Sequence, residues 1–230
     1  MVEHAPTFGS SEHHLIGASS AWGPDTSGFG EGIATDDSKT AFFLRHARGR
    51  SVLDVGCVQH DPANYQSKYW LHKALASEAS SIVGLDLYQP GVDYLVERGF
   101  NIRHGDACNY DLGRTFDVIA AGDIVEHLGN IDGFLSCSRR HMHAASTLVV
   151  STPNPWYWRP MVKALLADEV SNNPEHTCWY CPRTFRQLAA RHGIKVDEIQ
   201  FGSRYAKDRY APLPRRWRHT SFYLACSLER

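Results

Sequence analysis

Ser51-Val-Leu-Asp-Val-Gly56 is a short apolar run that ends in an aspartate and a glycine, and Ile82-Val-Gly-Leu-Asp-Leu87 repeats the pattern about thirty residues later. Both runs are typical of strands buried on two faces, as in a parallel sheet. Phe116-Asp-Val-Ile-Ala-Ala-Gly-Asp123 has a similar form and leads into Ile124-Val-Glu-His-Leu128. Because parallel strands end at one edge of a sheet, we expect these acids to gather where open α/β sheets bind ligands.

Strand and helix patterns alternate along the chain, which predicts an α/β fold with helices on both faces of a mostly parallel sheet. The expected elements are a short helix from Lys39, strand 51–56, helix 62–78, strand 82–87, helix 90–98, strands 101–105 and 116–121, helix 131–143, strand 147–152 and helix 182–192. Two final strands, 195–201 and 221–228, show alternation and lie close in sequence. We expect them to pair antiparallel at the sheet edge.

The chain has 230 residues, of which 43% are hydrophobic, and this is enough for one core. Residues 1–35 are rich in Gly, Ser and Pro and show no sustained apolar period. We therefore expect a flexible arm over 1–35 and a folded domain over 36–230. Trp22 and Phe29 leave open that the arm closes over a ligand as a lid.

The formal net charge of −1 gives no overall electrostatic reason to expect nucleic acid or an acidic membrane as partner. No stretch approaches the roughly 20 apolar residues of a spanning helix, and the amino terminus lacks the layout of a secretion signal.

Six cysteines lie mostly in or beside apolar segments and are expected to be free thiols. Packing explains Cys178-Trp-Tyr-Cys181 better than zinc or a redox pair, because only His176 is close by as a further ligand. A cytoplasmic protein without a membrane partner is expected.

The order of these motifs resembles that of the class I S-adenosylmethionine-dependent methyltransferases. Within the family, the chain is similar to bacterial members that act in glycan and secondary-metabolite pathways. The resemblance covers about residues 45–200. It implies a Rossmann-like, doubly wound sheet of seven strands with an antiparallel edge pair, and S-adenosylmethionine as cofactor. It is specific for the cofactor and says little about the acceptor.

The resemblance also implies a set of cofactor-binding residues. Asp86, at the tip of the second strand, can accept hydrogen bonds from both ribose hydroxyls. Gly56 lets the backbone approach the methionine part, and Asp54 orients that turn or meets the ammonium group through water. Asp106 matches the family position at the adenine amino group, with Ala107 beside the ring. Further cofactor contacts are expected at Leu87 and Gly122.

The loop after the first strand departs from the family pattern. The family commonly has Asp-x-Gly-x-Gly-x-Gly, whereas Asp54-Val-Gly-Cys-Val-Gln-His-Asp61 keeps one of the three glycines. The loop is therefore expected to be wider or differently shaped, which leaves room for His60 or Asp61 to contact cofactor or substrate. The missing Gly-x-Gly-x-x-Gly turn argues against an NAD-linked oxidoreductase.

Asp123, Glu126 and His127 follow the fourth strand at the ligand-binding edge and are the candidate catalytic residues. Methyl transfer needs an aligned nucleophile and, for a hydroxyl, removal of its proton, so His127 is a candidate general base. The segment also resembles two metal-using branches, the small-RNA terminal 2′-O-methyltransferases and the ubiquinone-pathway O-methyltransferases. That resemblance implies Mg²⁺ or a transition ion bound by Asp123, Glu126, His127 and His176. Metal-free relatives share Glu-His-Leu, so both interpretations of His127 stay open.

The acceptor is the least specified feature. We expect O-methylation of a hydroxylated small molecule or glycan. The aromatic segment 154–161 either contributes to the acceptor pocket or packs against the sheet. The basic loop 204–219 favours, as an alternative, an RNA methyltransferase, although nucleic acid is not the expected partner. A third possibility is a module that binds the cofactor without catalysis, and nothing in the sequence sets the oligomeric state.

Overall fold

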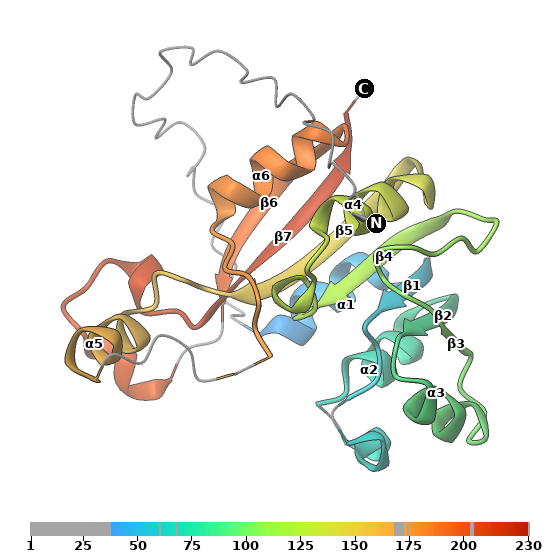
Figure 1. Ribbon diagram of the computed structural model, residues 1–230, viewed down its shortest axis with the longest axis horizontal. Helices are drawn as coiled ribbons and strands as arrows, with labels where there is room; N and C mark the ends of the chain where they lie inside the picture. Colours follow the sequence, from blue (N-terminus) through green and yellow to red (C-terminus); the bar gives the residue numbers. More distant parts are fainter. Residues whose placement is uncertain are drawn as a thin grey trace, which may run out of the picture. The chain divides into compact units, whose positions relative to one another are not determined.

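The computed structural model describes residues 38–229, apart from 60, 68, 168–172, 174 and 203–204. These residues form a seven-stranded sheet in the order β3-β2-β1-β4-β5-β7-β6 (Figure 1). The expected arm over 1–35 lies outside the described residues, and so does His60.

Five strands run parallel: β1 (Ser51–Val55), β2 (Ser81–Asp86), β3 (Ile102–His104), β4 (Phe116–Gly122) and β5 (Met142–Pro153). β7 (Ser221–Leu228) pairs antiparallel with both β5 and β6 (Ile194–Gly202). The predicted α/β sheet with its antiparallel edge pair is confirmed. The strand order reverses between β1 and β4, which is the position where open α/β sheets form a crevice for ligands.

Helices cover both faces of the sheet. They are α1 (Lys39–Ala47), α2 (Leu71–Glu78), α3 (Gln89–Val96), α4 (Ile131–Arg140), α5 (Trp158–Ala167) and α6 (Pro182–Arg191), with the short 3-10 turns η1 (Pro62–Gln66), η2 (Val125–His127), η3 (Ala206–Tyr210) and η4 (Arg215–Trp217). Because strand side chains alternate, Val52 packs in the cluster with α1 and α2, and Leu53 packs in the cluster with α4 and α6. Figure 1 shows α4 and α6 together on the near face.

The prediction of one helix over 62–78 is wrong, because two separate elements, η1 and α2, form there. Ser67 and Trp70 have extended backbones, with ψ of 135° and 111°. The break lets Trp70 bury its ring, 2% exposed, and donate from Nε1 to the Cys57 carbonyl at 2.7 Å. Its neighbour Tyr69 is 76% exposed.

Two other boundaries differ from the predictions. The helix expected to reach residue 143 ends at Arg140, and β5 begins at Met142, where the His143 N–H is taken by the Ser146 hydroxyl. The aromatic segment contains a helix that was not predicted, α5, with Pro160 in its first turn. None of the described helices is long and apolar enough to span a bilayer.

Candidate functional site

A cavity of about 590 Å³ lies at the carboxyl ends of β1 and β4, where the strand order reverses. This volume falls within the range of small-molecule sites. Its ionisable lining is mostly acidic, with one lysine: Asp54, Asp61, Asp86, Asp123 and Glu175 against Lys39, together with His72 and His127. We call it the cofactor cavity below, for the ligand that the sequence implies there.

Gly56 shapes the loop after β1. Its φ of +73° is a conformation that residues with a Cβ rarely adopt, and its N–H donates to the Leu85 carbonyl at 2.8 Å. A Cβ at this position would lie 2.8 Å from Ile124 Cδ1, so the loop packs tightly on the segment after β4. Asp61 also lines the cavity, and its carboxylate caps η1 through the Ala63 N–H.

Asp54 and His72 form a buried pair in the cavity wall, 2% and 1% exposed. Asp54 Oδ2 lies 2.9 Å from His72 Nδ1. Burial of a carboxylate is favourable only with such a partner, so His72 holds the acid at the end of β1. His72 was not among the predicted site residues, although a histidine at a helix position facing the sheet could have indicated a partner for a buried acid.

Asp86 is anchored at the end of β2 by its neighbours' backbone. Its Oδ2 accepts from the Val58 N–H at 2.8 Å and its Oδ1 from the Tyr88 N–H at 2.9 Å. Burial raises the pKa of this carboxyl, and the two N–H donors oppose that rise. Each oxygen keeps a second lone pair available to a ligand in the cavity.

Among the other expected cofactor residues, Gly122 lines the cavity and packs so closely on Leu71 that a Cβ would lie 2.6 Å from its Cδ2. Asp106 and Leu87 are exposed, and Ala107 packs on the edge of the core. These three residues are not part of the cavity lining. Asp106 instead accepts from the Cys108 N–H at 2.8 Å and organises its own turn.

Asp123 follows β4 with a φ of +53°, unusual for a residue other than glycine. Its carboxylate is used twice: Oδ1 accepts from the Ser151 hydroxyl at 2.6 Å, and Oδ2 pairs with Lys39 Nζ at 2.6 Å. The carboxylate thereby ties the turn to β5 and to the start of α1. Lys39 lies 84 residues away in sequence, and no local pattern pointed to it.

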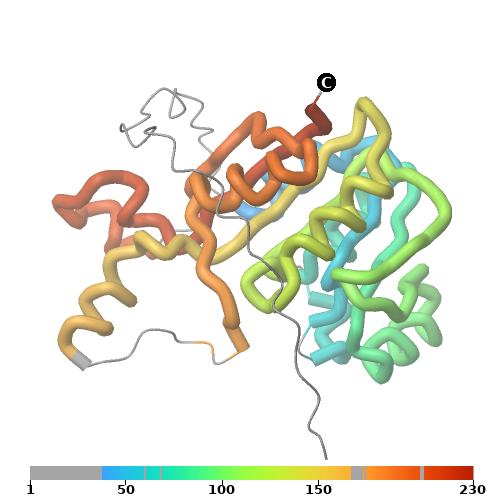
Figure 2. Tube along the Cα trace, turned by 45° about the horizontal axis from the view of Figure 1, so that its top comes forward, coloured from blue at the N-terminus to red at the C-terminus, as the bar shows by residue number. Residues whose placement is uncertain are grey.

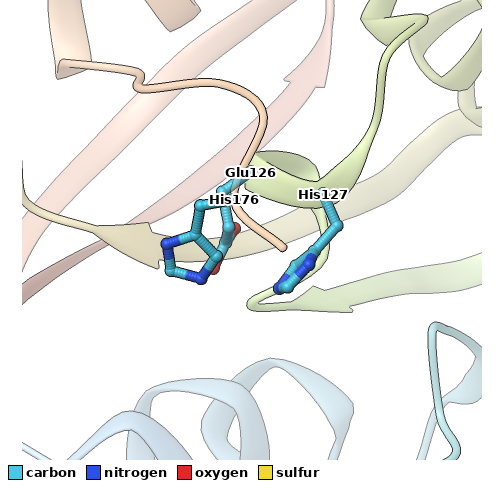
Figure 3. A group of neighbouring side chains, drawn as sticks. All are labelled: Glu126, His127 and His176. Carbon is cyan, nitrogen blue, oxygen red and sulfur yellow. The ribbon is translucent and has the colours of Figure 1, made fainter. Parts of the chain in front are cut away.

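Glu126, His127 and His176 come together beside the cavity, with their ligand atoms within 4.8 Å of one another. Figure 3 shows the side chains of η2 and of the separate loop that carries His176 extending to the same side. The two imidazole rings are nearly perpendicular, with centroids 4.8 Å apart. Asp123, the fourth residue of the predicted metal set, is not in this group.

The backbone of Glu126 brings the distant histidine into place. Its carbonyl accepts from the Thr177 N–H at 2.9 Å and the Cys178 N–H at 3.1 Å. These two bonds hold the loop that contains His176 against η2. Thr177 and Glu126 are 51 residues apart in the sequence. The neighbouring Thr152 hydroxyl donates to Glu126 Oε2 at 2.9 Å.

The electrostatics of the three residues favour a neutral or cation-neutralised cluster. Glu126 is 2% exposed, and burial, with the negative charge of Asp123, raises its pKa to about 7. Burial and the nearby His127 lower the pKa of His176. A neutral imidazole is the form that ligates a metal ion, and two of them with one carboxylate are a donor set that divalent cations accept.

All six cysteines are free thiols. Cys178 Sγ lies 3.6 Å from the Leu128 carbonyl, and Cys181 caps the start of α6. Among the described residues, the cluster at Glu126 is the only group of three or more metal-ligating side chains, and it contains neither thiol. The packing interpretation of the Cys-x-x-Cys spacing fits these contacts.

The aromatic segment does not reach the cofactor cavity. The Tyr157 hydroxyl donates to Asp208 Oδ2 at 2.7 Å, and Trp158 Nε1 donates to Asp208 Oδ1 at 3.2 Å. The Asn154 amide also donates to the Arg216 and His219 carbonyls, at 2.6 and 2.8 Å. Residues 154–167 and 205–219, which we call the cap, therefore pack on each other. Figures 1 and 2 show α5 and the segment with η3 and η4 together beyond the end of β5.

Comparison with known proteins agrees with this geometry. A family described as "Methyltransferase domain" matches residues 34–199. A ubiquinone biosynthesis O-methyltransferase from Rickettsia akari is 20% identical over 70% of this chain and 65% of its own length. A probable S-adenosylmethionine-dependent methyltransferase from Mycolicibacterium smegmatis is 26% identical over 65% of this chain and 54% of its own length. This chain thus spans less than two thirds of both relatives.

The fold has close structural counterparts. The crystal structure of a SAM-dependent methyltransferase from Archaeoglobus fulgidus superposes with a TM-score of 0.62, at 18% identity, over 82% of this chain and 90% of that one. The seven-stranded order with its antiparallel edge pair is common to this architecture. The chain belongs to the methyltransferase-domain family, within the class I S-adenosylmethionine-dependent methyltransferases.

Proposed function

We propose that this protein transfers the methyl group of S-adenosylmethionine to a hydroxyl oxygen of a small molecule or glycan. The proposal is carried by one observation: the cluster of Glu126, His127 and His176 adjoins the cofactor cavity, and His127 belongs to both. Family membership supports the sulfonium donor. The distant relative named an O-methyltransferase supports oxygen as the acceptor atom.

In this proposal the acidic cavity binds the cofactor, whose sulfonium and ammonium groups are positive. Asp86 accepts hydrogen bonds from the ribose hydroxyls through its remaining lone pairs, and the backbone at Gly56 approaches the methionine part. Asp54 meets the ammonium group or supports the loop that does. The adenine end extends toward β3, where Asp106 and Ala107 are the proposed contacts. Leu87 and Gly122 complete the proposed set.

The reaction is an in-line displacement. The acceptor oxygen forms a bond to the methyl carbon while the carbon–sulfur bond breaks, which gives S-adenosylhomocysteine and releases the hydroxyl proton. His127 is the group at the cavity wall that can take this proton. Glu126 orients the cluster through its bond from Thr152, and Asp123 fixes the turn rather than touching the acceptor.

The same three side chains fit a divalent cation. Two imidazole nitrogens and one carboxylate oxygen favour a transition ion over Mg²⁺, because imidazole is a softer ligand than water or carboxylate. Such an ion would lower the pKa of a hydroxyl bound to it. His127 then acts as a ligand, together with Glu126 and His176, instead of as a free base.

The test combines product detection with matched variants. Release of S-adenosylhomocysteine is measured over a panel of sugars, phenols and RNAs, with His127→Ala expected to reduce turnover about 100-fold or more while cofactor affinity stays within about threefold. His192→Ala, on the capping residue of α6, is the control histidine. A chelator and added Mg²⁺ or Mn²⁺ separate the two roles: loss of activity with chelator and in His176→Ala supports a metal ligand, and loss in His127→Ala alone supports a free base.

Other outcomes would overturn the proposal. Methylation of RNA alone, with an affinity that falls steeply with salt, would assign the protein to RNA methylation. Binding of S-adenosylmethionine without product on any acceptor would favour a non-catalytic module. Product formation that is unchanged in His127→Ala would remove the cluster from the mechanism. A cytoplasmic location is part of the proposal, and the six free thiols support it.

A further inference from the structure

The cap carries an apolar surface that the other described residues leave exposed. Helix α5 exposes Leu165 by 85% and Leu166 by 82%, and the adjoining Val162 and Met161 by 40% and 37%. Single exposed apolar residues are ordinary, but four on one helix form a patch of the kind that marks a contact surface. The cofactor cavity does not involve any of these residues.

A second cavity, of about 560 Å³, lies against the same helix. Arg159, Lys163 and Lys207 line it, with Tyr157 and Tyr205 as its aromatic walls, and none of its lining residues in the described part of the chain is acidic. The charge of Arg159 is balanced by its ion pair with Asp208, so Lys163 and Lys207 supply the positive charge of this cavity. Two ammonium groups beside tyrosine walls suit a phosphate-bearing group. This ligand class is opposite in charge to the one the cofactor cavity suits.

The sequence around the cap also has more basic than acidic residues. Residues 154–172 and 203–219 contain eight Lys and Arg against three Asp and Glu, a net charge of +5 in a chain whose formal net charge is −1. Asp168 and Glu169 are included in this count, although they lie outside the described residues. The positive charge is therefore concentrated on the part of the chain that bears the exposed leucines.

A single buried carboxylate holds this surface together. Asp208 is 0% exposed and accepts from Tyr157, from Trp158 and, at 2.7 and 3.0 Å, from the Arg159 guanidinium. Burial alone would raise the pKa of Asp208, but these donors outweigh it and lower the pKa. α5 and η3 are thus fastened to each other, so the leucines and the cations keep a defined relation.

We propose that the cap docks on an anionic lipid surface, with a phosphate headgroup in the basic cavity and Leu165 and Leu166 among the acyl chains. An amphipathic helix with apolar residues beside basic ones is the usual device for binding in the plane of a bilayer interface, and each basic residue adds electrostatic attraction. An RNA strand would match the cations but not the leucines. A second copy of the chain would match the leucines but meet its own positive charge.

This surface contact needs no spanning helix and does not depend on the proposed methyl transfer. It differs from the expectation that the chain has no membrane partner, because that expectation considered only overall charge and spanning segments. The acceptor of a methyltransferase held at a bilayer would be reached from the membrane surface, but the binding test below requires no turnover.

Vesicle flotation of the full chain tests the proposal. Binding to phosphatidylcholine vesicles containing about 30% phosphatidylglycerol is expected to be about tenfold tighter than to phosphatidylcholine alone, and to weaken as NaCl rises from about 0.05 to 0.5 M. Leu165→Glu with Leu166→Glu, and separately Lys163→Glu with Lys207→Glu, are each expected to weaken binding about tenfold. The matched controls are Val96→Glu, a 46% exposed valine on α3, and Lys195→Glu on β6, and neither should change it.

Four results would overturn the proposal. They are no binding to either vesicle, equal binding of the leucine variant and the unmodified chain, a dimer in light scattering that the leucine variant abolishes without any vesicle binding, and binding of mixed RNA in place of vesicles. Competition for vesicle binding by soluble glycerol phosphate at millimolar concentration would support the placement of the lipid headgroup in the cavity. Circular dichroism of each variant confirms that a loss of binding is not a loss of fold.

Discussion

The two cavities of this protein differ in charge and in construction. The cofactor cavity is lined by five acids and one lysine: four of the acids come from the ends of parallel strands and the segments that follow them, Glu175 from the loop before α6, and Lys39 from α1. Among the described residues, the cap cavity is lined by three basic side chains and by no acid, from α5 and η3. One is complementary to a sulfonium donor, and the other to a phosphate-bearing ligand.

Their supports differ as well. The acids at the cofactor cavity are held by the sheet: Asp86 by two backbone N–H groups, Asp54 by His72, and Asp123 by Ser151 and Lys39. The two segments of the cap are joined outside the sheet, by Asp208 and by the Asn154 amide, which donates to the Arg216 and His219 carbonyls. The sheet therefore fixes the acids of the cofactor cavity, whereas the cap cavity depends on contacts between two segments outside the sheet.

The largest expected effect is on stability, and it comes from comparing the same Leu→Ala substitution at a buried position of the sheet and at an exposed position of the cap. Leu53→Ala removes a fully buried side chain from the core under the cofactor cavity and should cost about 3 kcal/mol in the free energy of unfolding. Leu165→Ala, at 85% exposed, should change it by less than about 0.5 kcal/mol. Urea unfolding measures both. Similar losses in the two variants would mean that α5 buries its apolar face after all.

The next effect concerns cofactor binding alone. Asp86→Ala should weaken binding of S-adenosylhomocysteine about 30-fold, because hydrogen bonds to a charged group contribute about 2 kcal/mol. Calorimetry gives the dissociation constant, with Asp93→Ala on the exposed side of α3 as the control. An unchanged affinity in Asp86→Ala would contradict its role at the ribose, and vesicle binding by the cap should be the same in both variants.

A third variant should disturb the cap and spare the sheet. Asp208→Ala leaves Tyr157, Trp158 and Arg159 without their shared acceptor, so amide exchange in α5 and η3 should speed up roughly tenfold. Hydrogen-exchange mass spectrometry resolves these segments from the strands. Asp132→Ala, which breaks an exposed pair with His192, is the control. Faster exchange spread over β1 and β4 would show that cap and sheet unfold together.

The smallest effect lies at the amino end of β4, opposite the cofactor cavity. Hydrogen bonds from the Ser51 hydroxyl and N–H, and then the His143 ring, lower the pKa of Asp117 to about 2. Because the folded pKa is below the ordinary 3.8, this stabilisation is present above pH 3.8 and is lost as the pH falls through about 2. The carboxylate is 39% exposed, so Asp117→Asn should cost only about 1 kcal/mol at pH 6.

Thermal unfolding from pH 6 to pH 2 checks the sign of this dependence. The difference between Asp117→Asn and the unmodified chain should narrow as the pH falls and disappear near pH 2. A difference that grows on acidification would contradict the assignment. Asp93→Asn is the control carboxylate.

The sheet was predictable because its signals are local. Buried apolar runs such as Val52 to Val55, closed by a turn glycine, specify strands whatever lies elsewhere in the chain. The break between η1 and α2 was not predictable in this way, because it depends on the space that Trp70 fills beside Cys57. α5 was missed because its aromatic and proline residues mask a helical pattern of exposed leucines.

The sequence by itself determined which segments form the parallel strands and which acids stand at their ends, since both depend on the apolar pattern and turn chemistry of neighbouring residues. Tertiary structure alone decided that His176 joins His127, that Asp123 turns to Lys39, and that three side chains of the cap share one buried aspartate, Asp208. These contacts join residues distant along the chain. Their distances are set by how helices and loops pack on the sheet, and no short stretch of sequence contains that information.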